Sequence, residues 1–199
     1  MFTQHSGHTS RRHFLATSLI AAMGSLTAAE SRARRIVLRS SWQTVNIGDI
    51  AHTPGVLALL EKYLPEVEVR LWPSSVGNGV AEMLRARFPQ LSIIQTPEAL
   101  QTAFEECDFL VHGSGPSLVA AQDIAKWRDT TGKPYGVYGI TFNAPDAATT
   151  DPQRMNKFQQ SIPIMSGARF VFFRDSVSLA EAKKRGCTCP VMGFGPDGA

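Results

Sequence analysis

The stretch TVNIGDIAH contains a polar turn whose residue types suit ligand binding at the start of a helix. Gly48 permits a sharp change of chain direction, and Asp49 can accept hydrogen bonds from the unpaired backbone N–H groups of a helix start. Asn46 tolerates unusual backbone angles, and His52 follows three residues after Asp49. Helix capping alone explains this pattern. Alternatively, the free N–H groups and partial positive charge of the helix start hold an anionic or polyhydroxyl ligand.

A second stretch, VHGSGPSLV, places two glycines around a serine after an apolar run. Gly113 and Gly115 permit close backbone approach to something bound. Ser114 or Ser117 can cap the helix expected next, and a tight strand-to-helix connection is the alternative interpretation. The stretch is not a phosphate-binding P-loop, since no Gly-Lys-Ser/Thr follows, and it lacks the Gly-x-Ser-x-Gly spacing of a nucleophile elbow.

A third stretch, VFFRDSVS, joins an apolar run to a helical pattern. Asp175 or Ser176 can cap that helix, and Ser178 lies in its first turn. Arg174 ends the apolar run, where its planar guanidinium can bind a carboxylate or phosphate through two parallel hydrogen bonds. Its alternative role is an ion pair with Asp175 or another acidic residue.

Histidine is the other candidate for chemistry, because its pKa lies close to neutral pH. His52 and His112 are the only histidines after the first thirteen residues. Both are candidates for proton transfer, and each can equally be a packed or capping residue. No third ligand at metal-binding spacing accompanies them, so the sequence predicts no metal site, and it indicates no cofactor.

The elements that must position these residues alternate along the chain. Apolar runs of strand length are each followed by a helical pattern, which predicts a doubly wound α/β domain with a mostly parallel sheet and helices on both faces. We expect this single domain to span residues 34–195. The expected strands are 35–41, 66–72, 91–95, 107–113, 133–141, 168–175 and 189–194, and the expected helices are 50–63, 78–88, 97–106, 117–132, 152–166 and 176–186.

Ligands of such sheets bind beyond the carboxyl ends of the strands, where the strand order reverses. The loops at this edge are expected at 41–49, 73–78, 112–118, 140–150 and 174–176. The three polar stretches should therefore converge on one edge of the sheet. The strand order itself does not follow from the sequence.

Residues 1–29 have the composition of an export signal rather than of a folded domain. Arg11 and Arg12 precede an apolar run that ends in small residues near Ala29. Consecutive arginines before such a run are typical of twin-arginine signals, which send folded proteins across the bacterial inner membrane. We expect an exported protein, periplasmic or at the cell surface, that contacts the membrane only through this signal. An uncleaved anchor is the alternative.

The charge balance argues against a nucleic-acid partner. The formal net charge is +3, and Arg11 and Arg12 account for two of these charges, which leaves +1 on the remainder. A nearly neutral domain lacks the basic surface that nucleic-acid binding requires.

The cysteine count is odd, which excludes a fully paired disulfide framework. Cys107 lies in an apolar run and is expected to be buried as a small hydrophobic residue. Cys187 and Cys189 are too close together for an easy disulfide, so we expect thiols; a strained bridge is the alternative.

Several segments, taken in order, resemble the polysaccharide pyruvyl transferase family. They are NIGDIAHTPGVLALLEKYLP, CDFLVHGSGPSL, KPYGVYGITFNAP, FVFFRDSVSLAEAKKRG and GFGPDGA. The family shows an Asn-x-Gly-Asp turn, a strand ending in three glycines, a glycine-containing strand, an Arg-Asp/Glu-x-x-Ser helix start and a Pro-Asp near a domain junction. Here Gly-Ser-Gly replaces the three glycines, and YGITFNAP departs from the usual Gln-Ser-Ile-Gly-Pro.

The resemblance implies transfer of a pyruvyl group from phosphoenolpyruvate to a pair of hydroxyls on a cell-surface polysaccharide. It also implies two Rossmann-like domains facing a cleft, as in many glycosyltransferases. This chain matches the amino-terminal half, with residues 196–199 as the start of a linker to a second domain. The substrate-binding residues that it implies are Asn46, Gly48, Asp49, Gly113, Ser114, Gly115, Arg174, Asp175 and Ser178.

Two other functions fit the same sequence features. One is a non-catalytic module that binds a glycan, because a fold alone does not specify function. The other is a glycosyltransferase that uses a nucleotide-sugar. In every case a glycan is the expected partner, and phosphoenolpyruvate is the donor only for pyruvyl transfer.

Overall fold

A computed structural model describes residues 33–142 and 151–199. The expected export signal and residues 143–150 lie outside the described residues. The strands are β1 (Arg35–Ser40), β2 (Glu68–Pro73), β3 (Ser92–Ile93), β4 (Phe109–His112), β5 (Tyr135–Ile140), β6 (Val171–Phe173) and β7 (Met192–Phe194). The helices are α2 (Ile47–Tyr63), α3 (Val80–Arg87), α4 (Pro97–Glu106), α5 (Ala121–Thr131), α6 (Pro152–Ser166) and α7 (Ser176–Lys184).

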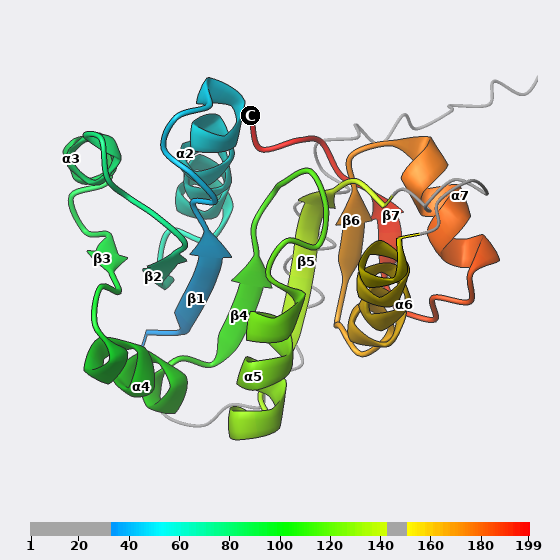
Figure 1. The fold of residues 1–199 in the computed structure, drawn as a ribbon. Helices are drawn as coiled ribbons and strands as arrows, with labels where there is room; N and C mark the ends of the chain where they lie inside the picture. Colours follow the sequence, from blue (N-terminus) through cyan, green and yellow to red (C-terminus); the bar gives the residue numbers. More distant parts are fainter. Residues whose placement is uncertain (1–32, 143–150) are drawn as a thin grey trace, which may run out of the picture. The chain divides into compact units, whose positions relative to one another are not determined.

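The seven strands form one parallel sheet with the order β3-β2-β1-β4-β5-β6-β7 (Figure 1). The predicted parallel α/β architecture is confirmed. The strand order reverses between β1 and β4, which pair directly from Ile36 with Phe109 to Arg39 with His112. The loops that leave β1 and β4 therefore diverge to opposite faces, and the crevice between them is the expected place for a ligand.

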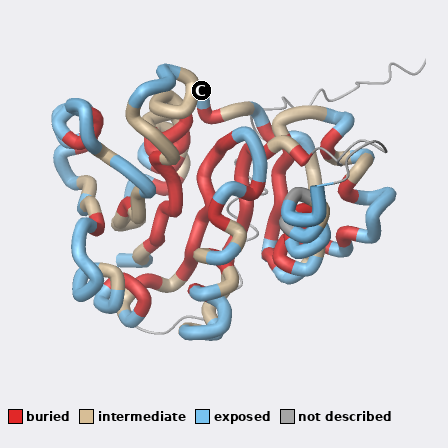
Figure 2. Tube along the Cα trace, viewed as in Figure 1, coloured by how far each residue is buried: buried red, intermediate tan, exposed pale blue. Residues whose placement is uncertain are grey.

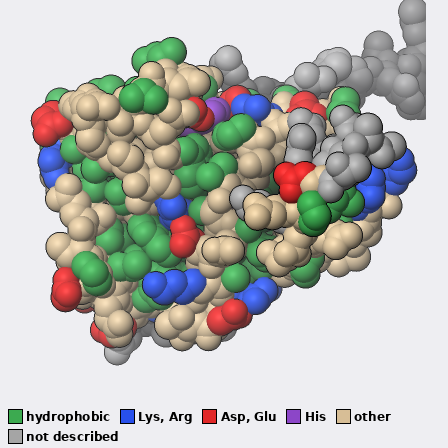
Figure 3. Space-filling view, in the orientation of Figure 1, with side chains coloured by type: hydrophobic (Ala, Val, Ile, Leu, Met, Phe, Trp, Pro, Cys, Tyr) green, Lys and Arg blue, Asp and Glu red, His purple; other side chains and the backbone are tan. Residues whose placement is uncertain are grey.

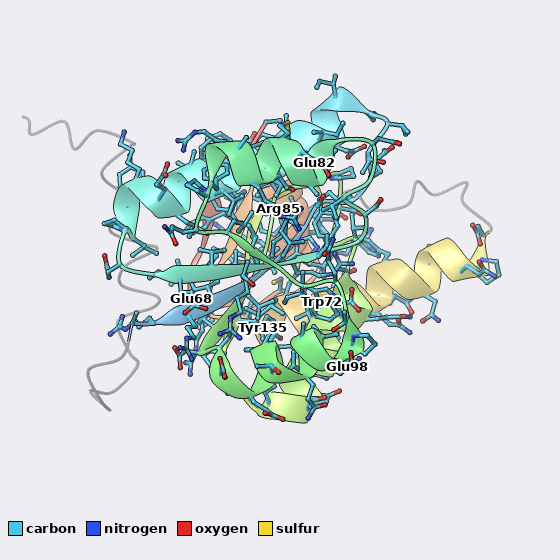
Figure 4. The ribbon with its side chains drawn as sticks, turned by 90° about the vertical axis from the view of Figure 1, so that its left-hand side faces the viewer. Glu68, Trp72, Glu82, Arg85, Glu98 and Tyr135 are labelled. Atoms are coloured by element: carbon cyan, nitrogen blue, oxygen red, sulfur yellow. The ribbon has the colours of Figure 1, made fainter. Side chains whose placement is uncertain are left out.

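Helices cover both faces of the sheet. In Figure 4, which views the domain from its β3 side, Glu82 and Arg85 of α3 lie on one side of β2 and Glu98 of α4 lies on the other. The strands between these layers are buried, as the red tube in Figure 2 shows. Burial on both faces explains why the strands are nearly continuous apolar runs.

The core on the α4 to α7 side is rich in aromatic residues. Trp127 of α5 is fully buried, and its indole packs edge-on against Phe104 of α4, with the ring centroids 5.1 Å apart. Phe104 in turn packs edge-on against Trp72 of β2 at 5.5 Å. The Trp127 indole N–H is satisfied by the backbone carbonyls of Lys133 and Pro134, both at 3.2 Å. These contacts fix α4 and α5 against the half of the sheet that contains the reversal in strand order.

Helix α2 begins earlier than the sequence pattern indicates. We expected a start near residue 50 with Asp49 as the cap, but the cap is Asn46, whose side-chain oxygen accepts a hydrogen bond from Gly48 N at 2.9 Å. Asp49 lies inside the first turn. Asn46 is as good a cap as aspartate, and it starts the helix about one turn earlier than Asp49 would.

Helix α5 begins later than expected, at Ala121, and the predicted serine caps are wrong. Its N-cap is Ala120, which has no capping side chain. Ser114 and Ser117 both precede the N-cap residue, and the Ser114 hydroxyl instead donates to Asp197 at 2.6 Å and accepts from Gly198 N at 3.0 Å. The chain between β4 and α5 is therefore an extended loop.

The last residues fold back onto the carboxyl edge of the sheet. Residues 196–199, which we expected to begin a linker, belong to the same compact unit as the rest of the described residues. Gly198 N donates to Ser114 Oγ at 3.0 Å. A Cβ atom on Gly55 of α2 would lie 1.5 Å from the Gly198 carbonyl oxygen, so direct contact between the two backbones requires glycine at position 55. Asp197 is thereby held at the centre of this edge.

The three cysteines are buried free thiols, as predicted, and Cys187 and Cys189 form no disulfide. Burial raises the pKa of Cys107 and of Cys189 to about 11, so both thiols are protonated at neutral pH.

Among residues 33–142 and 151–199, no helix combines the length and the apolar character that a membrane crossing needs. The same residues contain no group of three acidic, histidine or cysteine side chains placed to hold a metal ion.

Candidate functional site

Three residues predicted from separate stretches meet at one carboxylate. Asp197 Oδ1 accepts from Ser114 Oγ at 2.6 Å and lies 2.8 Å from His52 Nδ1, while Oδ2 accepts from Arg174 Nη1 at 2.8 Å. We call His52, Ser114, Arg174 and Asp197 the Asp197 cluster. Its members come from α2, the loop after β4, the end of β6 and the C-terminal segment. The convergence of the loops after β4 and β6 follows from the parallel sheet, because all its strands end at the same edge.

The environment of Asp197 favours its ionised form. Burial acts to raise the pKa of this carboxyl, but the hydrogen bonds from Ser114 and Arg174, together with the charge that His52 carries when its ring is protonated, outweigh burial and lower the pKa below its usual value. Asp197 is not among the residues predicted from the sequence. Its only signal was the Pro-Asp of GFGPDGA, which was interpreted as the beginning of a linker.

His52 is oriented as a proton acceptor. The ring is buried, and its Nδ1 faces the Asp197 carboxylate, which places the proton of the neutral ring on Nδ1. The other nitrogen, Nε2, then carries a lone pair, and it has no hydrogen-bond partner within the described part of the chain. A carboxylate behind a histidine fixes the tautomer and stabilises the charged ring after proton uptake. The pair can therefore act as a general base.

Arg174 keeps one side of its guanidinium available. Its Nε donates to Thr141 Oγ1 and its Nη1 donates to Asp197. Its Nη2 has no partner among the described residues, and the side chain is 30% exposed. Two N–H donors at the edge of the sheet suit a carboxylate or phosphate oxygen. Anion binding by Arg174 stays a prediction.

The glycines around Ser114 are required by neighbouring side chains of the protein itself. A Cβ atom on Gly113 would lie 2.8 Å from Ser40 Oγ, and one on Gly115 would lie 2.7 Å from the indole nitrogen of Trp42. The same indole donates to the Ser114 carbonyl oxygen at 2.7 Å. The close approaches that these glycines permit within the described residues are to Ser40 and Trp42.

His112 lies in the interior and has a packing role. It is fully buried, its ring is 4.8 Å from that of Trp42, and its Nε2 accepts from Ala120 N at 3.3 Å. Burial, together with the charge of Arg39, lowers its pKa to about 3, so the ring is neutral. Its Nδ1 has no hydrogen-bond partner within the described residues. Because His112 has no exposed atom, it does not reach a ligand for the proton transfer that was expected of it.

The turn at residues 46–49 bonds locally instead of joining the Asp197 cluster. Asn46 caps α2 through Gly48 N, and Asp49 accepts from the side-chain nitrogen of Gln43. The neighbouring side chains Val45 and Ile47 are about 80% exposed. These contacts match the capping alternative for this stretch.

The predicted cap of α7 is confirmed. Asp175 Oδ1 accepts from Ser178 N at 2.6 Å, and Asp175 Oδ2 accepts from Ser178 Oγ at 2.7 Å. Ser178 is fully buried and its hydroxyl also accepts from Phe142 N at 2.8 Å. Both residues therefore hold α7 to the end of β5, and their polar atoms face the protein.

A cleft of about 740 Å³ opens beside the Asp197 cluster, and we call it the Arg39 cleft. On the face seen in Figure 3, hydrophobic side chains gather between α2 and α5 with few charged side chains among them. Thr141, which accepts from Arg174, also lines the cleft. Its other lining residues are Arg39, Ser74, Pro116, Ser117, Leu118, Val119, Ala120, Ala121, Gln122, Asp123, Phe142, Phe158, Gln160 and Ser161.

Arg39 is the buried polar centre of this cleft. Its guanidinium carbon lies 5.2 Å from the centre of the Trp42 ring and 5.3 Å from that of Trp72, so the charge is held over two indoles. Its Nε donates to Asp123 Oδ2 at 2.8 Å. The sequence analysis did not select Arg39, because an arginine within an apolar run resembles an ordinary surface residue of a strand.

No family model matches the sequence, and no curated protein is significantly similar to it. Among solved structures, the chain is similar to UGT71G1 of Medicago truncatula complexed with UDP-glucose, with a TM-score of 0.52 and 9% sequence identity over 80% of this chain and 50% of that one. A UGT transferase of Siraitia grosvenorii in complex with UDP has a TM-score of 0.46 at 9% identity, again over 80% and 50%. The E. coli heptosyltransferase WaaC with ADP-2-deoxy-2-fluoro heptose has a TM-score of 0.37 at 15% identity, over 71% and 47%.

These neighbours are glycosyltransferases, and the likeness to UGT71G1 supports the Rossmann-like α/β fold of this chain. The chain spans about half the length of the structures that it matches. At 9% identity the comparison concerns the fold alone.

Proposed function

We propose that this chain is the acceptor-side half of a transferase that modifies a sugar hydroxyl, and that the transferred group is pyruvyl from phosphoenolpyruvate. The observation that carries this proposal is the Asp197 cluster, which brings a histidine general base and a partly free arginine to one edge of the sheet. The ordered segments that resemble polysaccharide pyruvyl transferases support the finer part of the proposal. The glycosyltransferase-like fold supports a glycan acceptor.

The proposed roles follow from the free atoms of the cluster. His52 Nε2 removes the proton from an attacking sugar hydroxyl, and the Asp197 carboxylate stabilises the positive ring that results. Arg174 Nη2 holds the carboxylate or phosphate of the donor. Over the whole reaction two hydroxyls form bonds to carbon 2 of phosphoenolpyruvate and the phosphate leaves. One hydroxyl proton ends on the methylene carbon, which becomes a methyl group, and the other ends on the phosphate.

The location is part of the same proposal. Arg11 and Arg12 lie outside the described residues, and we propose that they direct export to the periplasm or cell surface. Replacing both with lysine should stop processing of the precursor, which fractionation and immunoblotting would detect. Export that continues unchanged in the double variant would contradict a twin-arginine route.

The test of the donor is a titration of the protein with phosphoenolpyruvate, followed by ligand-observed NMR. We expect Arg174→Ala to weaken binding about tenfold or more, because a hydrogen-bonded charge is removed. The matched control is Arg185→Ala, which removes an arginine paired with Glu181 on the surface of α7. Phosphoenolpyruvate that does not bind, or that binds Arg174→Ala as well as the unchanged protein, would overturn pyruvyl transfer.

A second candidate function is glycosyl transfer from a nucleotide-sugar. It is favoured by the likeness to UGT71G1, whose structure contains UDP-glucose. The same titration with UDP-glucose separates the two donors. Binding of UDP-glucose without binding of phosphoenolpyruvate favours this second function, and glycan binding without either donor favours a non-catalytic module.

A further inference from the structure

The hydrogen bonds of the Arg39–Asp123 pair leave one donor and one acceptor free. Beyond the Nε bond to Asp123, Arg39 Nη1 donates to the carbonyl oxygens of Ser40 at 3.3 Å and Trp72 at 3.1 Å, and Nη2 donates to Ser74 Oγ at 2.8 Å. A guanidinium has five N–H groups, so one N–H on Nη2 is left. On the other side of the pair, Asp123 Oδ1 has no hydrogen-bond partner among the described residues, and its side chain is 32% exposed.

A free N–H beside a free carboxylate oxygen suits two neighbouring hydroxyls of a sugar. One hydroxyl can accept from Arg39 while the other donates to Asp123, and a hydroxyl does both with equal ease. Bonds to charged groups are stronger than those between neutral groups, so each contributes orientation as well as affinity.

The rest of the cleft supplies the apolar surface that a sugar ring also needs. Phe142 and Phe158 stack with their centroids 4.7 Å apart, and both line the cleft together with Leu118 and Val119. Polar side chains such as Gln160 stand among them. Small-molecule sites typically combine a largely apolar lining with a few placed polar groups. A volume of about 740 Å³ is large enough for one or two sugar rings.

The charges of the cleft disfavour an anion. Arg39 and Asp123 are the only charged side chains in the described lining, and they neutralise each other. Four of the five N–H groups of the arginine are occupied, whereas one oxygen of the partly exposed Asp123 carboxylate has no hydrogen-bond partner among the described residues. A carboxylate or phosphate would approach that oxygen with like charge and without a free cation to compensate.

From this geometry we propose that the Arg39 cleft binds a neutral sugar through two adjacent hydroxyls and discriminates against uronic acids and phosphorylated sugars. The inference rests on the proposed function, for which it names the class of acceptor. Thr141 both lines the cleft and accepts from Arg174, so the sugar lies beside the group proposed to hold the donor.

Saturation-transfer NMR against matched glycosides tests this site. The probes are the methyl β-glycosides of glucose and galactose, with methyl β-glucuronide as the charged counterpart that differs from the glucoside only at carbon 6. We expect at least one neutral glycoside to bind, and the glucuronide to bind at least tenfold more weakly than the glucoside. Asp123→Asn should weaken binding of the neutral sugar about tenfold and reduce the preference over the glucuronide.

The matched control is Asp129→Asn, which removes a carboxylate from the exposed face of the same helix, where it pairs with Arg128. If Asp123→Asn lowers the melting temperature, the comparison of the glucoside with the glucuronide on the unchanged protein still tests the inference. Failure of both glycosides to bind, glucuronide binding equal to that of the glucoside, or equal binding to Asp123→Asn and Asp129→Asn would overturn the inference.

The result is separable from that for the donor. Phosphoenolpyruvate binding that depends on Arg174, without sugar binding, would retain the proposed function and remove the neutral-sugar site. Sugar binding that depends on Asp123, without phosphoenolpyruvate binding, would retain the site and remove pyruvyl transfer.

Discussion

Two arginine–aspartate pairs lie at the carboxyl edge of the sheet. They differ in whether the arginine or the aspartate has an atom without a hydrogen-bond partner among the described residues. In the Asp197 cluster both carboxylate oxygens are bonded, while Arg174 Nη2 has no partner within the described parts of the chain. In the Arg39 cleft the arginine has used most of its donors, while one oxygen of Asp123 has no partner within the same parts. Both pairs have a 2.8 Å contact. The same kind of ion pair can thus suit an anion at one place and a neutral hydroxyl at another.

Among the substitutions, the largest loss of stability at neutral pH should come from replacing Arg39 at the centre of the Arg39 cleft. Arg39→Ala leaves Asp123 without its partner and removes the guanidinium packed between Trp42 and Trp72, so we expect a loss of about 3 kcal/mol in the free energy of unfolding. Urea denaturation measures it. The control, Arg128→Ala, breaks an exposed pair on α5 and should change stability by about 0.5 kcal/mol or less. Similar losses in the two variants would show that the Arg39 pair is not structural.

His112, which packs against Trp42, should make the free energy of unfolding depend on pH. The folded protein keeps His112 neutral with a pKa of about 3, whereas the unfolded chain takes up a proton near the ordinary value of 6.5. The unfolded state then binds more protons, so stability falls as the pH is lowered from 6.5 towards 3, by about 1.4 kcal/mol per pH unit. Urea midpoints at pH 6, 5 and 4 should show this slope in the protein and lack it in His112→Gln. Parallel slopes would mean that His112 is protonated in the folded state.

A smaller effect is expected at the centre of the cluster. Asp197→Asn removes the charge that pairs with Arg174 and His52, and we expect a loss of about 1–2 kcal/mol at neutral pH. The folded-state pKa of Asp197 is lowered from 3.8, so the contribution of the carboxylate is present above that pH and is lost as the pH falls through the lower folded-state value. The difference between the two proteins should therefore shrink in acid. A loss larger than that of Arg39→Ala would reverse the comparison.

The smallest effect belongs to the turn that bonds only locally. Asn46→Ala removes the cap of α2, at an expected cost of about 0.5–1 kcal/mol in thermal or urea unfolding. It should leave the affinity for phosphoenolpyruvate and for glycosides unchanged, because Asn46 contacts Gly48 and belongs to neither region. Lost ligand binding with unchanged stability would instead place this turn in a ligand site.

The fold could be predicted because it depends on local pattern. Apolar runs separated by helical periodicity indicated all seven strands, although β3, β6 and β7 are each much shorter than their runs. The strand order could not be predicted, since buried parallel strands look alike in sequence. Helix starts were wrong where several polar residues could cap, as at Asn46 and Asp49.

The site was only partly predictable for a related reason. Ser114 and Arg174 follow strands, so the parallel sheet alone brings them to one edge. Asp197 is 83 residues from Ser114, and its position depends on backbone contact between Gly55 and Gly198. The pairing of Arg39 with Asp123 spans 84 residues and depends on how α5 packs beside β1. Neither contact leaves a pattern within a short stretch of sequence.

Trp42 touches both regions, since its indole bonds the Ser114 carbonyl oxygen, stacks on His112 and lies beneath Arg39. The chain contains three tryptophans, and the other two, Trp72 and Trp127, are linked through Phe104 in the core. With those two replaced by phenylalanine, the emission of Trp42 would serve as an intrinsic optical reporter. A single fluorophore would then register occupancy of the cleft and rearrangement of the cluster in the same titration, without an attached dye.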